Sequence, residues 1–140
     1  MTKNIFFLLF AVIVAISNHY SCKGKDEKPL NPNGDAELAL LMRKMASHTE
    51  SLRTSLHDNS GINIYPADFE NILTATPTDS TLDRPLFTGF AKGYLNNLKT
   101  FYDSPDSLQV KNYNMMVNGC INCHRNFCSG PLKRIKKMLI

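Results

Sequence analysis

Two cysteines and a histidine near the C-terminal end form the pattern Cys120-Ile121-Asn122-Cys123-His124. Two thiols three residues apart, followed at once by an imidazole, are typical of the attachment site of a c-type haem. In this chemistry each thiol adds to a haem vinyl group as a thioether, and the imidazole binds the iron from the proximal side. The spacing therefore predicts covalent attachment of one haem c through Cys120 and Cys123, with His124 as the proximal iron ligand.

Other sites use a similar pair of cysteines, and the sequence disfavours them. A structural zinc site would need a second Cys or His pair at metal-finger spacing, and none follows the motif. A thioredoxin-like redox site would need a βαβ context, which the sequence lacks. The chain also has no Gly-rich phosphate loop and no Ser/His/Asp arrangement, so we do not predict an enzyme.

The elements that must position this motif are predicted to be helices, because apolar residues recur at steps of three and four. The expected helices cover residues 36–57, 67–75, 87–102 and 105–127. Asp35 is the expected N-cap of the first helix, and Ser104 the expected N-cap of the last, with Pro105 as its first residue. Gly130 and Pro131 should end the last helix.

No alternating strand pattern of useful length appears, which favours an all-α protein. The predicted fold is an antiparallel four-helix bundle with a short second helix and the haem motif late in the last helix. On a helix, residues 120, 123 and 124 share one face, so about one turn can hold one edge of the macrocycle.

The N-terminus is predicted to be a targeting segment. Lys3 precedes an apolar run over residues 5–16, as in a secretory signal peptide. We predict a signal peptide over residues 1–21, a flexible tether over residues 22–33, and a helical domain over residues 34–140. Cys22 fits the lipidated first residue of a mature lipoprotein, although cleavage after Ser17 would also release the chain. Both alternatives place the domain outside the cytoplasm, in the periplasm or the outer cell envelope.

The charge of the chain is concentrated at its C-terminal end. The formal net charge is +4, and Lys133, Arg134, Lys136 and Lys137 account for all of it. This distribution argues against a nucleic-acid surface. The basic tail over residues 132–140 either packs its apolar side chains on the bundle or docks an acidic redox partner or an anionic membrane surface.

An exported, all-helical chain with this motif in its last helix resembles the cytochrome c′ family over roughly residues 35–128. The stretch from Leu41 to His48 looks like the Leu-x-x-Met-Ala-Ser-His stretch of some cytochromes c′. The match gives Met42 the position that faces the distal side of the iron. The resemblance implies a ligating methionine in low-spin members, a bulky apolar residue in high-spin members, and a homodimer in many.

The chain also resembles short Bacteroidetes lipoproteins described as cytochrome c family proteins. The shared segments are Gly34 to Arg43 at the start of the domain and Cys128 to Lys137 at its end. This second resemblance narrows the family and implies no particular reaction.

Several residues have more than one interpretation. Met42, or less favourably Met45, is either a distal iron ligand or a core residue, since methionine fills irregular interiors well. His48 is a weaker distal alternative. Arg125 either pairs with a haem propionate or is solvated. Cys128 is a free buried thiol, a disulfide partner of Cys22, or an intermolecular bridge.

The sequence therefore predicts an exported, membrane-anchored, mono-haem c-type cytochrome that transfers single electrons to a redox partner it does not identify. The alternative is a five-coordinate haem that binds nitric oxide or carbon monoxide as a sensor or scavenger. Peroxidase-like chemistry is a weaker hypothesis, for which His48 or Arg43 would have to act as the distal polar group.

Overall fold

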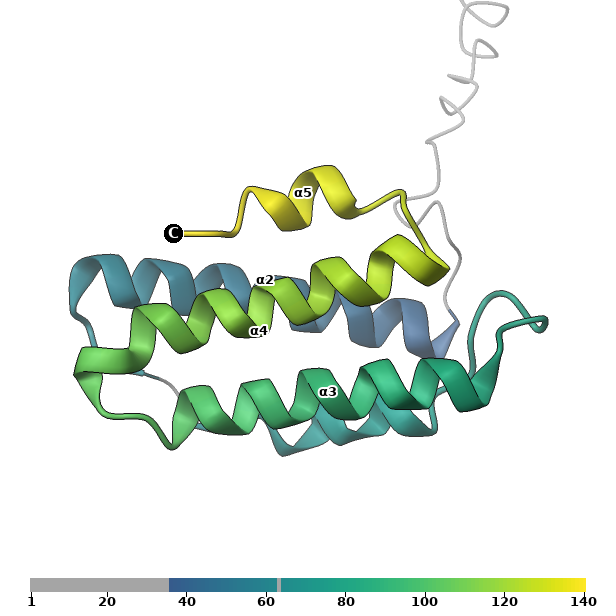
Figure 1. Ribbon diagram of the computed structural model, residues 1–140, viewed down its shortest axis with the longest axis horizontal. Helices are drawn as coiled ribbons and strands as arrows, with labels where there is room; N and C mark the ends of the chain where they lie inside the picture. The colour runs from purple at the N-terminus through teal and green to yellow at the C-terminus, as the bar shows by residue number, and fades with distance from the viewer. Residues whose placement is uncertain (1–35, 63) are drawn as a thin grey trace, which may run out of the picture. The chain divides into compact units, whose positions relative to one another are not determined.

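The computed structural model describes residues 36–62 and 64–140, and every regular element within these ranges is a helix (Figure 1). The elements are α2 (Glu37–Asp58), the 3-10 helix η1 (Ala67–Leu73), α3 (Arg84–Tyr102), α4 (Asp106–Phe127) and α5 (Leu132–Lys136). The prediction of an all-α chain is confirmed for this part of the protein. The predicted signal peptide, tether and lipidated Cys22 lie outside the described residues.

The helices form a bundle, in which α3 and α4 make the most extensive pair (Figure 1). The apolar face of α3 explains this pairing, because its buried residues recur at steps of four and three. They are Phe87, Ala91, Tyr94, Leu98 and Phe101. Such spacing places side chains on one face of a helix, which α3 buries in the core.

The short helix η1 and the loop behind it are tied to the beginning of α2. Phe69 and Ile72 of η1 are buried in the core. The carboxylate of Glu37 accepts hydrogen bonds from the backbone N–H and the hydroxyl of Thr76, both at 2.9 Å. The Leu38 N–H in turn donates to the Thr76 carbonyl at 3.0 Å. These bonds hold the loop after η1 against the first turn of α2.

Two predicted helix caps are wrong. The N-cap of α2 is Ala36, and the expected cap, Asp35, lies outside the described residues. Pro105 is the N-cap of α4 and not its first residue, since the helix begins at Asp106. The Ser104 hydroxyl donates to the Phe101 carbonyl at 2.6 Å, so it helps to end α3 rather than to begin α4.

The C-terminal segment packs on the bundle. Ile135 and Met138 are buried, which confirms the prediction that apolar residues of the tail pack inward. The hydroxyl of Tyr113 on α4, itself fully buried, donates to the Met138 carbonyl at 2.9 Å and lies 3.2 Å from the Thr49 carbonyl of α2. One tyrosine thus links α4, α2 and the tail. Among the described residues, no helix is long and apolar enough to cross a membrane.

Candidate functional site

The motif residues lie in the last turns of α4. Cys123 is buried, whereas Cys120 and His124 are half-buried. Phe127, at the end of the helix, packs edge-to-face against Phe87 and Phe90 of α3, with ring centroids 5.5 and 5.6 Å apart. This aromatic cluster fixes the end of α4 against α3 and thereby fixes the position of the motif.

The imidazole of His124 is oriented by the backbone at the end of its own helix. Its Nδ1 lies 3.0 Å from the Cys128 carbonyl oxygen. A carbonyl can only accept, so Nδ1 must carry the proton and donate it, which leaves the Nε2 of a neutral ring with a free lone pair. This is the arrangement that orients metal-binding histidines in proteins. Nε2 is therefore the His124 atom whose lone pair is available to bind a metal.

The two thiols are held in their protonated form. Burial raises the pKa of Cys120 from its ordinary value of 9.0 to about 12, and nearby Cys123 adds to the shift. Burial likewise raises the pKa of Cys123 to about 11. A dithiol redox site works through a lowered thiol pKa, so this pair lacks the electrostatics of such a site.

A cavity of about 430 Å³ lies beside the motif. Its volume is within the usual range for small-molecule and cofactor sites. Its lining comes from α2, the loop before α3, α3, α4 and the C-terminal segment. The apolar lining residues include Leu38, Met42, Leu82, Phe87, Cys123, Phe127, Ile135 and Met138. His124 lines the same cavity.

The cavity distinguishes between the two methionines of α2. Met42 is half-buried and lines the cavity together with His124. Met45 is 6% exposed, belongs to the hydrophobic core and does not line the cavity. The structure therefore brings Met42 and His124 to one space and places Met45 in the core.

Other residues considered from the sequence lie elsewhere. The Nε2 of His48 lies 2.8 Å from the Tyr102 hydroxyl, and the ring contacts Phe69 edge-to-face, so His48 does not line the cavity. Arg125 is exposed and does not line it either. Cys128 is exposed, so the interpretation as a buried thiol is wrong. It lies at the edge of the cavity, and its carbonyl orients His124.

Two arginines that the sequence analysis did not connect with a haem propionate line this cavity. These are Arg43 of α2 and Arg134 of α5. Arg134 forms a two-point ion pair with Glu50, at 2.9 Å for each contact. The third charged residue of the lining is Asp79, whose carboxylate accepts hydrogen bonds from Thr81. Cationic side chains thus outnumber carboxylates around this cavity.

The donor set fits a covalent haem in most respects. The site combines two protonated thiols and an imidazole with a free Nε2, and Met42 lines the same largely apolar cavity as His124. Cys120 does not line the cavity and influences the ionisation of buried Tyr94 instead. The Tyr94 hydroxyl has no hydrogen-bond partner among the described residues, and a buried unpaired hydroxyl costs about 1–3 kcal/mol. Tyr94 does not line this cavity, so its hydroxyl does not test the fit of a group bound there.

The sequence did not reveal which residues from outside the four predicted helices line the cavity. Leu82 and the loop residues Pro77 to Asp79 come from the connection before α3, and Ile135 and Met138 come from the tail. The sequence shows the alternation of apolar and basic residues in the tail, but it does not predict which part of the bundle the tail packs against.

Within the described residues, no three His, Cys, Asp or Glu side chains are grouped so that they could hold a metal ion. Comparison with protein-family models, with curated proteins and with solved structures found no match.

Proposed function

We propose that this protein is an exported mono-haem c-type cytochrome that transfers single electrons and catalyses no reaction of its own. The observation that supports this proposal most directly is the cavity that His124, Met42 and one of the two motif thiols, Cys123, line together. The proposed fold is an antiparallel four-helix bundle of the cytochrome c′ type, with the haem attached to α4. The proposed location is the periplasm or outer cell envelope, with Cys22 as the lipid anchor.

Each residue has a defined part in this proposal. Cys120 and Cys123 hold the macrocycle covalently, which prevents its loss outside the cell. His124 would bind the iron through Nε2, and the bond from its Nδ1 to the Cys128 carbonyl keeps the ring oriented. Met42 would offer the iron a soft thioether sulfur, a ligand type that raises the reduction potential. The bound haem supplies a one-electron iron couple.

The apolar lining has its own part in electron transfer. Phe87, Phe127 and Ile135 line the cavity with apolar side chains, which would limit the access of water to a bound haem. A site whose structure changes little when the iron gains or loses an electron suits a carrier of single electrons. The protein sets the reduction potential of the haem through its burial and its axial ligands. Arg43 and Arg134 line the cavity and would offer positive charge to the haem propionates, while Arg134 also pairs with Glu50.

The test is covalent haem staining of the full chain, expressed with the machinery that attaches c-type haem. The wild-type chain should retain haem after denaturing electrophoresis, and the variant C120S/C123S should lose it. Cys128→Ser is the matched control, because Cys128 lies outside the motif and should leave staining unchanged. Staining of the double variant at the wild-type level would rule out the attachment.

The second candidate is a five-coordinate haem that binds nitric oxide or carbon monoxide. It is favoured by the open volume beside Met42, which is only half-buried and could wall the cavity without binding the iron. Optical spectra separate the candidates, since a methionine-bound iron is low-spin and a five-coordinate iron is high-spin. Met42→Leu should convert a low-spin spectrum to high-spin, whereas Met45→Leu, the matched core substitution, should not. An unchanged spectrum for Met42→Leu rejects Met42 as the ligand.

A further inference from the structure

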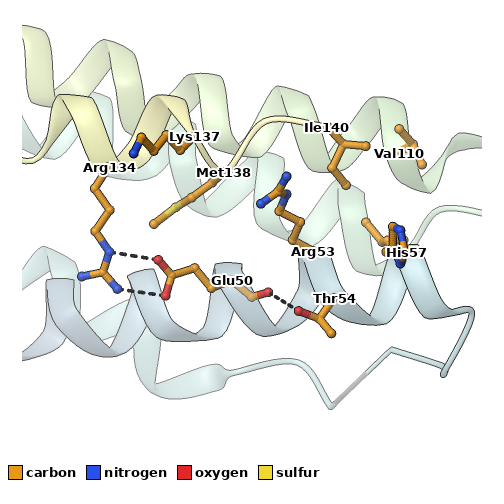
Figure 2. A pocket seen from close by; sticks show the side chains of 10 residues that line it. Glu50, Arg53, Thr54, His57, Val110, Arg134, Lys137, Met138 and Ile140 are labelled. Atoms are coloured by element: carbon orange, nitrogen blue, oxygen red, sulfur yellow. Dashed lines mark hydrogen bonds and ion pairs between the residues drawn. The ribbon is translucent and has the colours of Figure 1, made fainter.

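A second cavity, of about 560 Å³, lies between α2, the first turns of α4 and the C-terminal segment (Figure 2). It is comparable in size to the cavity beside the haem motif, and the proposed haem leaves it unexplained. Neither a motif cysteine nor His124 lines it. Its charged and apolar side chains are arranged in a way that points to a ligand.

Cations predominate in the lining. The lining contains three cationic side chains, Arg53, Arg134 and Lys137, and one carboxylate side chain, Glu50. Figure 2 shows the two-point pair between Glu50 and Arg134, which neutralises both groups, and Arg53 extending from α2 toward the C-terminal segment. Arg53 and Lys137 form no ion pair with any residue of the described ranges. His57 also lines the cavity, and its Nδ1 lies 2.7 Å from the Asp58 carboxylate.

The rest of the lining is apolar and partly open to solvent. Val110 and Ile140 are large apolar residues with exposed fractions of 46% and 53%, and both line this cavity. Leu56 is half-buried and Met138 is buried beside them. Apolar side chains exposed at a concave site, next to unpaired cations, suit a molecule with an apolar body and an anionic head.

We propose that this cavity binds a small amphiphilic anion, in which a carboxylate or phosphate oxyanion is attached to a short alkyl body. Arg53 binds the oxyanion, Lys137 adds positive charge to the same cavity, and Val110, Ile140 and Met138 contact the alkyl body. Either cation alone would bind any anion weakly, and the apolar wall alone would bind any alkyl chain weakly. The combination selects molecules that carry both.

This site is independent of the haem but borders its cavity. Met138 and Arg134 line both cavities, so they form the wall between them. A ligand in the second cavity therefore contacts a side chain of the first. The Met138 methyl group is accordingly a reporter of binding that requires no substitution.

The test is calorimetric titration of the full chain with octanoate and octyl phosphate, compared with inorganic phosphate and octanol. Both amphiphilic anions should bind saturably and at least tenfold more tightly than either comparison compound, and should shift the Met138 methyl resonance. Tighter binding of octyl phosphate than octanoate would identify a phosphate-headed ligand such as a lipid, and the reverse order a free carboxylate. Equal binding of inorganic phosphate, or of octanol, would overturn the proposal, as would the absence of saturation.

Substitutions then locate the site. The variant R53Q/K137Q should bind octanoate about tenfold more weakly, because partly exposed charge pairs contribute modestly each. Lys133→Gln is the matched control, since Lys133 is an exposed lysine of the same tail that does not line the cavity. Both changed residues of R53Q/K137Q are exposed, so the fold should persist, as far-UV circular dichroism would verify. An unchanged affinity of R53Q/K137Q, or an equal loss in Lys133→Gln, would overturn the assignment.

Discussion

The two motif thiols should make the haem-free chain lose stability at alkaline pH. Burial raises the pKa of Cys120 from 9.0 to about 12 and that of Cys123 from 9.0 to about 11. A thiol whose pKa rises on folding stabilises the fold fully below the unfolded-state pKa, and this contribution is lost as pH rises through the folded-state pKa. The loss therefore begins near pH 9 and continues to pH 11 for Cys123 and pH 12 for Cys120.

The magnitude follows from the shifts. At pH 10 an unfolded thiol is about nine-tenths ionised, whereas the folded thiols remain mostly protonated. Ionisation one pH unit above the pKa stabilises the unfolded chain by about 1.4 kcal/mol for each thiol. The two thiols together should lower the free energy of unfolding by about 3 kcal/mol between about pH 8 and pH 10. This is a large fraction of the roughly 5–15 kcal/mol that stabilises an ordinary domain.

The assay is urea unfolding of the reduced, haem-free chain at both pH values, followed by far-UV circular dichroism. The variant C120A/C123A should lose most of the pH dependence and keep a smaller part from Tyr94, Tyr102 and Tyr113, because burial raises the pKa of each of these tyrosines. Cys128→Ala should keep the full dependence, because Cys128 is exposed. The haem-loaded chain should behave like the double variant, since thioethers do not titrate. An equal fall in stability for wild type and double variant would refute the reasoning.

Three further predictions concern the packing that holds the two cavities in shape. Tyr113→Phe keeps the ring but removes the hydroxyl that bonds the Met138 carbonyl, so it should lower the free energy of unfolding by about 1 kcal/mol in urea unfolding. Hydrogen exchange should show faster exchange of the amides in the tail. Leu98→Ala empties a fully buried position of α3 and should cost about 3 kcal/mol in the same unfolding assay. Glu50→Gln weakens a half-exposed ion pair with Arg134 and should cost less than about 1 kcal/mol; a larger loss would show that this pair fixes α5.

The helices were predictable because their signals are local. Apolar residues at steps of three and four mark α3 from Phe87 to Phe101, and the buried face of the helix contains the same residues. The caps were less predictable, because a cap depends on one backbone conformation and not on a repeating pattern. Ser104 illustrates this: its hydroxyl had a carbonyl of the preceding helix within reach and bonds it, so Pro105 became the cap.

The candidate site was predictable only where one helix carries it. Cys120, Cys123 and His124 lie close together because they are within two turns of α4. The choice of Met42 over Met45 as the residue facing His124 came from a resemblance, and the packing of α2 is what places Met42 in the cavity and Met45 in the core. Spacing alone could not decide this, because both methionines belong to the same apolar stripe.

The C-terminal tail lines both cavities. Its composition predicts an apolar side and a basic side, but not which cavity each side contacts. Its alternation gives it an apolar side, which packs on the bundle through Ile135 and Met138, and a basic side, which carries Arg134 and Lys137. The apolar side closes the cavity beside His124, and the basic side supplies cations to the second cavity. Because close-packed side chains transmit displacement, a ligand that moves Met138 in one cavity must change the wall of the other. The tail is therefore the element through which the two sites would influence each other.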